Sequence, residues 1–421
     1  MDTNPTPIPV PAKEPNPIPS LPDDLLLSIF ARLSRLYYPT LSLVSKSFRS
    51  LVALPVLYQN RSVINRTESC LYVCLKLPPD TTPRWFTLCQ KPNKTLINDI
   101  GKKKKQKKSS ETGNILIPIQ ISQSHQDHWK SVVSVGSSIY TIGKEVYLRS
   151  GVPARFKYHY RIGEEGYSSS VWILDSSVSI LDCTSHTWRD GPSMSVRRNS
   201  LAANVVDGKI YVAGGCKYGK YDESSACMEV FDPKTQVWEP VLYPFADKCI
   251  GNVYTSGVVD GEINMFGNDK HVVYKPKEDR WEVNEAYYGL ASRSCCFIGN
   301  ILYGYSIKEG IKWYDFKIRK WHILKGYVRF PGLPKSHGFD VRLVDCNGKM
   351  AVLWDERPPP PIRNWYDEEE LPPSQNRMLW CGVIKLKKFN SEEIFGEVEW
   401  FDPVLSVPDS YGIEHVISAT V

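Results

Sequence analysis

The sequence contains no long apolar run. No stretch of about 18 apolar residues, the length that a membrane-spanning helix needs, occurs among the 421 residues. The N-terminus, MDTNPTPIPVPAKEPNPIPS, lacks both the basic start and the apolar centre of a secretory signal. We therefore expect no membrane association, and a location in the cytoplasm, the nucleus or both.

Signatures of metal binding and of catalysis are also absent. The eleven cysteines include no Cys-x-x-Cys pair and no Cys/His cluster at zinc spacing, so we expect reduced, mostly buried thiols and no metal. The sequence has no Gly-x-Ser-x-Gly elbow, phosphate-binding loop or dinucleotide fingerprint. We therefore expect no cofactor and no enzymatic activity.

An excess of charge of one sign is missing from most of the chain. The formal net charge is +6, and much of it comes from the run GKKKKQKK at residues 101–108. A local run does not describe a basic surface, so we do not expect nucleic-acid binding. Two interpretations of Lys102–Lys108 stay open: a nuclear localisation signal or a solvated loop.

The N-terminal region falls into two parts. Residues 1–19 carry seven prolines and few large apolar side chains, which predicts a disordered tail. In residues 20–60 the apolar residues recur every three or four positions, which predicts short helices. A unit of about 40 residues is too small to cover this much apolar surface by itself. The helices therefore either pack on the following domain or bind a partner.

The rest of the chain, residues 66–421, reads as β-structure. Short apolar runs alternate with turn signals, and similar segments end in a tryptophan at steps of 50, 43 and 40 residues. These tryptophans are Trp188, Trp238, Trp281 and Trp321. A hairpin signal with Gly or Asn, such as Val206-Asp-Gly-Lys-Ile-Tyr211, precedes each of them. A four-stranded repeat of this length is typical of a propeller blade.

The predicted fold is mainly β, a six-bladed β-propeller behind a small helical unit, with five blades as the alternative. We place five blades at residues 115–188, 192–238, 243–281, 289–321 and 336–401. The runs at 71–77 and 84–88 are expected to form the third and fourth strands of a further blade, with Trp85 in the outer tryptophan position. Residues 415–421 are expected to supply a missing strand and close the ring, which removes two exposed sheet edges. Two loop insertions are expected, a basic flexible one at 93–114 and a proline-rich, acidic one at 356–376.

Two motifs resemble those of a known family. Arg198, followed by Gly214-Gly215, Tyr218, Asp232-Pro233 and Trp238, resembles a kelch repeat. The segment LPDDLLLSIFARLSR, with Leu43-Val44-Ser45-Lys46 and Phe48-Arg49-x-Leu51 after it, resembles the F-box of plant F-box/kelch-repeat proteins. Phe48 stands where many F-boxes have tryptophan. The propeller is therefore expected to be of the kelch type.

The resemblance implies a substrate-recognition subunit of an SCF-type E3 ubiquitin ligase. The F-box of such a subunit binds a SKP-type adaptor and, through it, a cullin-RING ligase, and the non-catalytic propeller binds a protein substrate. The adaptor-binding residues implied are Leu21, Pro22, Leu25, Ile29, Leu33, Leu43, Val44 and Phe48. The substrate-binding residues implied, on the loops between blades and after the glycine pairs, are Arg197, Arg198, Lys217, Tyr218, Tyr221, Asn252, Lys270, Arg293, Lys308 and His337.

The implied substrate-binding residues indicate the kind of substrate, and one other function stays open. The substrate-binding set leans basic and aromatic, which suits an acidic or phosphorylated segment of the substrate. The alternative is a kelch propeller outside any ligase, a scaffold or ligand-binding protein whose N-terminal helices pack in cis.

Overall fold

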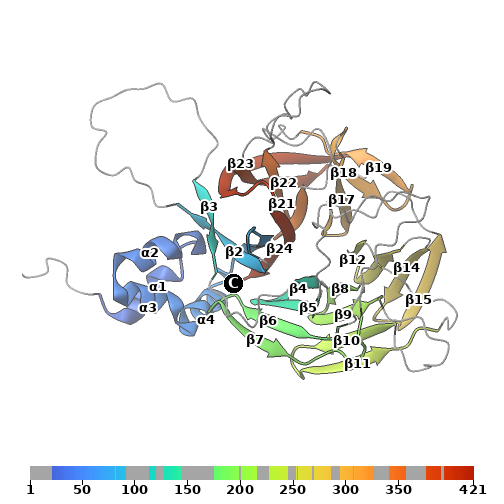
Figure 1. The fold of residues 1–421 in the computed structure, drawn as a ribbon, viewed down its shortest axis with the longest axis horizontal. Coiled ribbons are helices and arrows are strands. Elements are labelled where there is room, and N and C mark those ends of the chain that lie inside the picture. Colours follow the sequence, from blue (N-terminus) through green and yellow to red (C-terminus); the bar gives the residue numbers. More distant parts are fainter. Residues whose placement is uncertain are drawn as a thin grey trace, which may run out of the picture.

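The computed structural model shows a ring of β-sheets with a helical unit attached at one side (Figure 1). It describes residues 21–80, 82–91, 113–119, 128–144, 175–198, 201–215, 227–244, 253, 255–267, 270–285, 294–306, 308–326, 341–356, 376–389 and 393–421. The predicted tail and the basic run Lys102–Lys108 lie outside the described residues.

The helical unit consists of short helices joined by tight turns. They are α1 (Asp23–Phe30), the 3-10 helix η1 (Arg35–Tyr37), α2 (Tyr38–Val44), α3 (Lys46–Ala53) and α4 (Pro55–Val63). Prolines open two of them, since Pro39 lies in the first turn of α2 and Pro55 begins α4, where a missing N–H costs no helical hydrogen bond. A small core centred on Leu26, Phe30 and Leu57 holds the helices together.

Six antiparallel sheets of four strands form the ring. Blade 1 contains β4 (Trp129–Val135), β5 (Ser138–Lys144), β6 (Val178–Asp182) and β7 (Thr187–Gly191). Blade 2 contains β8 (Ala202–Val206), β9 (Lys209–Ala213), β10 (Met228–Asp232) and β11 (Val237–Val241). Blade 3 contains β12 (Thr255–Val259), β13 (Glu262–Phe266), β14 (Lys270–Lys275) and β15 (Arg280–Glu285).

The remaining blades complete the ring. Blade 4 contains β16 (Cys295–Ile298), β17 (Ile301–Ser306), β18 (Gly310–Asp315) and β19 (Lys320–Ile323). Blade 5 contains β20 (Arg342–Cys346), β21 (Lys349–Glu356), β22 (Arg377–Lys388) and β23 (Ile394–Val407). Blade 6 contains β24 (Gly412–Thr420), β1 (Ser69–Lys76), β2 (Pro83–Gln90) and β3 (Asn114–Pro118). The prediction of six blades is confirmed, and the five-bladed alternative is wrong.

Blade 6 closes the ring with strands from both ends of the chain. The C-terminal strand β24 pairs with β1 from Ser69↔Thr420 to Lys76↔Gly412, as expected. The expected strand order was wrong in one respect, because β1 and β2 are the second and third strands of the blade. The fourth strand is β3, whose residues the prediction places in the blade at 115–188. Trp85 therefore lies on the third strand, where it is buried against blade 1.

The bounds of the strands correct the ends of both predicted insertions. Asn114 is the first residue of β3, so the basic segment joins the third and fourth strands of blade 6. Glu356 is the last residue of β21 and residue 376 directly precedes β22, so the second insertion joins two strands of blade 5. Residues 93–112 and 357–375, for which loops are predicted, lie outside the described residues.

The repeated tryptophans mark the fourth strand of blades 1 to 4, as predicted. Each tryptophan faces one bulky residue of the third strand, in the pairs Leu181↔Trp188, Phe231↔Trp238, Tyr274↔Trp281 and Tyr314↔Trp321. Two residues before each tryptophan, one residue has a positive φ: His186, Gln236, Asp279 and Arg319. A left-handed residue there tightens the hairpin, which gives the four blades one common turn.

The described residues can be compared with the predictions for cysteines, metal ligands and membrane helices. The nine cysteines there form no disulfide, and burial raises the pKa of Cys89 and Cys183 to about 12, which keeps both protonated and unreactive. No group of three or more metal-ligating side chains occurs in the described ranges. Within the same residues, no helix is long and apolar enough to cross a membrane.

Candidate protein-interaction sites

One face of the helical unit is apolar and uncovered. It is formed by Leu21, Leu25, Ile29, Leu33, Leu43 and Val44, all of them exposed, and we call these six residues the apolar face. Leu43 and Val44, at the end of α2, expose 70% and 64% of their surface. Single exposed apolar side chains are ordinary, but six of them on one unit of about 40 residues are typical of a docking site.

The apolar face exists because α1 is apolar over a wide arc. Leu26 and Phe30, one turn apart, point into the core of the helical unit and are buried. Leu25 and Ile29, also one turn apart, lie about 100° away around the helix and remain exposed. The four short helices cover only one edge of this arc, so the other edge stays exposed.

Two of the eight implied adaptor-binding residues, Pro22 and Phe48, are not part of the apolar face. Pro22 is exposed and precedes α1, and its carbonyl oxygen accepts hydrogen bonds from the backbone N–H groups of Leu25 and Leu26, both at 3.1 Å. Phe48 is half-buried, and its ring packs edge-on against Phe30 with 5.0 Å between the centroids. Phe48 thus contributes to the core of the helical unit, and its contact with an adaptor stays a prediction.

Glu68 joins the helical unit to the propeller. One carboxylate oxygen accepts hydrogen bonds from the backbone N–H of Arg35 at 2.9 Å and from the hydroxyl of Ser34 at 3.1 Å. The other oxygen lies 3.2 Å from Nη2 of Arg61, whose side chain is fully buried. The backbone of Glu68 pairs with that of Val421 through two hydrogen bonds of 2.8 Å. The helices, the first strand and the C-terminus are therefore held at one point.

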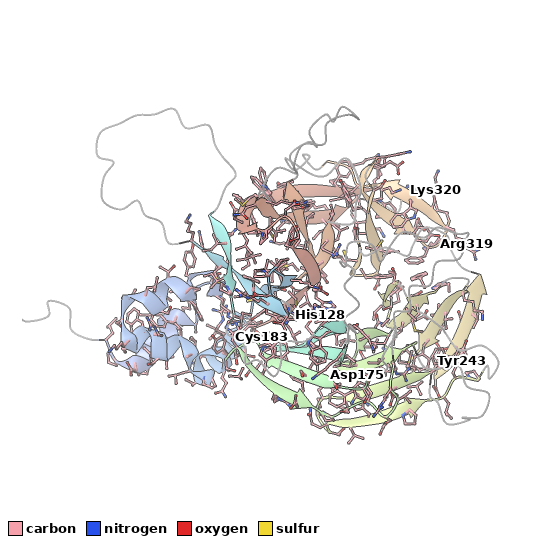
Figure 2. All side chains as sticks on the ribbon, viewed as in Figure 1. His128, Asp175, Cys183, Tyr243, Arg319 and Lys320 are labelled. Carbon is pink, nitrogen blue, oxygen red and sulfur yellow. The ribbon has the colours of Figure 1, made fainter. Side chains whose placement is uncertain are left out.

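Arg35 extends the same junction into blade 1. Its guanidinium is buried, lies over the ring of Tyr58 and donates to the carbonyl oxygen of Cys183. Cys183 lies where the helical unit meets the ring (Figure 2). The hydroxyl of Tyr72 donates to that same carbonyl at 3.2 Å. A buried cation with several fixed acceptors allows little relative movement, so the helical unit has a defined orientation on the propeller.

His186 makes the junction sensitive to pH. It lies 3.1 Å from Nη2 of Arg35, and burial together with that positive charge lowers the pKa of His186 to about 4, from an ordinary value of 6.5. The unfolded chain therefore binds more protons between pH 6.5 and 4, so stability is lost as the pH falls through this range. We expect His186→Asn, which suits the left-handed backbone at this position, to lose less unfolding free energy between pH 7 and 4.5, measured by urea denaturation. Equal losses in both proteins would contradict this assignment.

The implied substrate-binding residues are only partly within the described residues. Lys217, Tyr218, Tyr221, Asn252, Arg293 and His337 lie outside them. Arg197 and Lys308 are exposed, and Lys270 is half-buried at the start of β14. Their contact with a substrate stays a prediction.

Arg198 was wrongly assigned to substrate binding. Its side chain is fully buried and forms an ion pair with Glu229, which is 1% exposed, at 3.1 Å. Nη1 donates to the carbonyl oxygens of Gly214 and Cys227, both at 3.0 Å. Arg198 therefore ties the segment before blade 2 to the second and third strands of that blade. The sequence places Arg198 next to Arg197 in a predicted loop, which predicts an accessible side chain. In the structure the backbone of Arg198 pairs with that of Asp175, and the side chain of Arg198 points inward.

Sequence reasoning also missed the buried arginines of the junction. Arg61 lies one turn after Leu57 on the buried side of α4, and its Nη1 donates to the carbonyl oxygen of Leu33 at 2.5 Å. The helical spacing of Leu57 and Arg61 was the available signal. A charged residue at a core position is rare unless it is paired, and helical spacing does not identify the partner, Glu68.

Comparison with known proteins agrees with this architecture. Residues 18–60 match the F-box domain, and residues 85–405 match the FKB95 kelch-repeats domain. The chain is 46% identical over 411 residues to F-box/kelch-repeat protein At4g39550 of Arabidopsis thaliana, covering 96% of this chain and 94% of that protein. It is also 46% identical over 407 residues to F-box/kelch-repeat protein At5g51250 of the same plant, covering 96% and 100%. An F-box domain implies binding of a SKP-type adaptor. The chain belongs to the family of F-box/kelch-repeat proteins.

Proposed function

We propose that this protein is the substrate-recognition subunit of an SCF-type E3 ubiquitin ligase. The apolar face binds the SKP-type adaptor and connects the chain to a cullin-RING ligase, and the propeller binds a protein substrate for ubiquitination. The chain has no catalytic role of its own. It acts in the cytoplasm, the nucleus or both.

The observation that carries this proposal is the uncovered apolar face on an anchored helical unit. The core of the unit and the junction at Glu68 and Arg35 already define its packing on the propeller, and the six side chains of the apolar face are not among those that form this core. Burial of apolar area in a partner is the main source of affinity in such an interface.

The alternative of a scaffold with helices packed in cis receives less support. This alternative requires the apolar side chains of the helical unit to be buried in contacts within the same chain. Leu25, Ile29 and Val44 are exposed instead, while η1 and α2 contact strand β2 of the propeller.

Co-expression tests the proposal with the full chain. An uncovered apolar face favours self-association, so we expect a low soluble yield from the protein alone and a several-fold higher yield with a SKP-type adaptor. The two proteins should elute together in size-exclusion chromatography. A stable monomer that gains nothing from the adaptor and elutes apart from it would refute the proposed function.

A further inference from the structure

The charge of the helical unit after the first turn of α1 has one sign. Residues 25–67 contain no Asp or Glu, although these acids make up 46 of the 421 residues of the chain. The two acids before this segment, Asp23 and Asp24, lie in the first turn of α1, where the positive end of the helix dipole stabilises them. The segment itself contains six basic residues, Arg32, Arg35, Lys46, Arg49, Arg61 and Arg66.

Four of the six basic side chains stay available to a partner. Arg35 and Arg61 are buried and belong to the junction. Glu68, the next acid along the chain, is already bonded to Arg61 and to the start of η1. The other four basic side chains are exposed, and none of them forms an ion pair within the residues that the structure describes. A partner of the helical unit therefore meets a surplus of positive charge.

Lys46 and Arg49 lie at the edge of the apolar face. Lys46 is the first residue of α3, two positions after Val44. Nε of Arg49 donates a hydrogen bond to the carbonyl oxygen of Ser42 at 3.2 Å, which holds the guanidinium at the end of α2, where Leu43 and Val44 are exposed. A carbonyl group carries no net charge, so this bond orients the guanidinium without neutralising it. We call Lys46 and Arg49 the basic edge.

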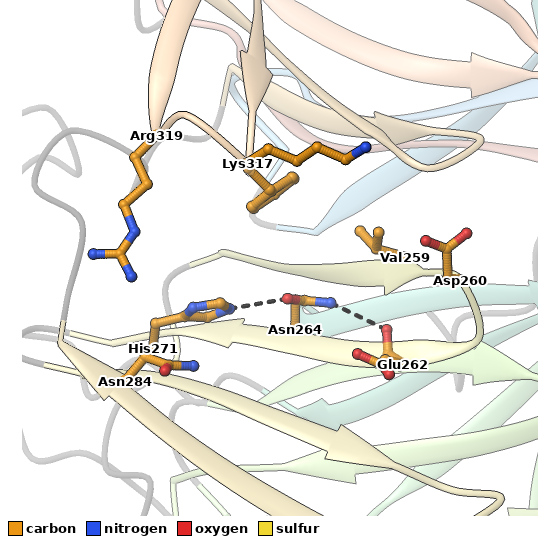
Figure 3. Close-up of a pocket in the computed structure, with 9 residues that line it drawn as sticks. Val259, Asp260, Glu262, Asn264, His271, Asn284, Lys317 and Arg319 are labelled. Atoms are coloured by element: carbon orange, nitrogen blue, oxygen red, sulfur yellow. Dashed lines mark hydrogen bonds between the residues drawn. The ribbon is translucent and has the colours of Figure 1, made fainter. Parts of the chain in front are cut away.

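The cleft between blades 3 and 4 differs from the basic edge in its charge. It has a volume of about 400 Å³ and is lined by acidic and basic side chains, among them Asp260, Glu262, Lys317 and Arg319 (Figure 3). Charges of both signs in one cleft favour neither an acidic nor a basic ligand. The basic edge, where the charge has one sign, therefore indicates the charge of its partner more clearly than the cleft does.

We propose that the basic edge selects adaptors that carry acidic side chains beside their apolar binding surface. This inference rests on the proposed function, which takes the adaptor as the partner of the apolar face. Carboxylates of the adaptor accept charge-assisted hydrogen bonds from Lys46 and Arg49. Opposite charges at the rim of an interface chiefly raise the association rate and exclude partners of the wrong charge. The apolar face thus supplies the affinity, and the basic edge decides which adaptor binds.

Charge reversal tests the basic edge with the full chain, made by cell-free translation and kept dilute. Association with an immobilised SKP-type adaptor is measured by biolayer interferometry. Lys46→Glu combined with Arg49→Glu should lower the association rate constant about tenfold or more at low salt, while the dissociation rate constant changes less. Salt screens the attraction, so the parent and the variant should become more alike as the salt concentration rises. Equal association rates at low salt would overturn the inference.

Two further variants exclude other causes of slower association. Arg66→Glu alters an exposed arginine of the same unit that lies two positions before Glu68 and is not part of the basic edge. It should associate as fast as the parent, and a loss equal to that of the double reversal would show that only net charge matters, which would also overturn the inference. Lys46→Gln combined with Arg49→Gln removes the charges without adding carboxylates and should give an intermediate rate.

A charge-swap scan on the adaptor tests the pairing from the other side. Each exposed carboxylate of the adaptor is replaced by lysine in turn and tested with the parent chain and with the double charge reversal. We expect at least one replacement to slow association with the parent and to restore association with the double reversal. A scan without such a replacement would contradict the pairing. Absence of any binding between the parent chain and the unaltered adaptor would instead refute the proposed function, and this inference with it.

Discussion

The double variant Ile29→Asp, Val44→Asp is expected to lose adaptor binding by at least about a hundredfold. Burial of an aliphatic side chain of this size contributes about 1.5–3 kcal/mol, so two such losses correspond to two or more orders of magnitude in the dissociation constant. Two buried carboxylates without partners add to the cost. The fold should be unaffected, because both side chains are exposed in the free chain. A pull-down with purified adaptor, quantified by isothermal titration calorimetry, measures the effect.

A control on the same helical unit separates this effect from a general loss of surface hydrophobicity. Val63, the last residue of α4, is 81% exposed and is not part of the apolar face. We expect Val63→Asp to bind the adaptor as the parent protein does. Undiminished binding by the double variant would show that the adaptor contacts another surface, and equal losses in both variants would show that the effect is unspecific.

Replacement of Arg198 by Met is expected to lower the free energy of unfolding by about 3–5 kcal/mol. The change leaves the carboxylate of Glu229 buried without its cation, although this carboxylate still accepts from the backbone N–H of Ser195 at 2.9 Å. It also removes the donor to the carbonyl oxygens of Gly214 and Cys227. Thermal and urea unfolding of the full chain, purified with its adaptor, measure the loss.

Two further variants distinguish a structural role from a binding role. Arg197→Met alters the neighbouring, exposed arginine and should change stability by less than about 0.5 kcal/mol. Arg198→Met combined with Glu229→Leu removes both charges and should be less destabilising than Arg198→Met alone. If Arg198→Met keeps full stability, the ion pair with Glu229 does not stabilise the blade and the structural role is wrong.

Most of the blade architecture could be predicted because its determinants are local. A hairpin turn needs residues that accept positive φ, and Asp207-Gly208, Asp260-Gly261 and Asn347-Gly348 supply them within one or two positions. A tryptophan on the fourth strand meets its partner on the third strand across a tight turn, so the pair is only seven residues apart, as in Phe231 and Trp238. The period of these features therefore indicated the propeller without knowledge of any distant contact.

The candidate sites were predicted less completely, for the opposite reason. The apolar face follows from helical spacing, which is again local. The substrate-binding residues depend on which side chains of a loop point outward, and Arg198 points inward because Glu229, 31 positions later, lies beneath it.

The sequence by itself determined the class of fold, the closing of the ring by the C-terminal strand and a helical unit with more apolar surface than it can cover. Only the tertiary structure decided that β3 completes blade 6, that Glu68, Arg35 and Arg61 join the helices to the ring, and that Arg198 is buried beside Glu229. The first group depends on periodicity and turn chemistry, which act over a few residues. The second depends on contacts between segments far apart in the chain, and charged or polar partners at such distances leave no periodic pattern.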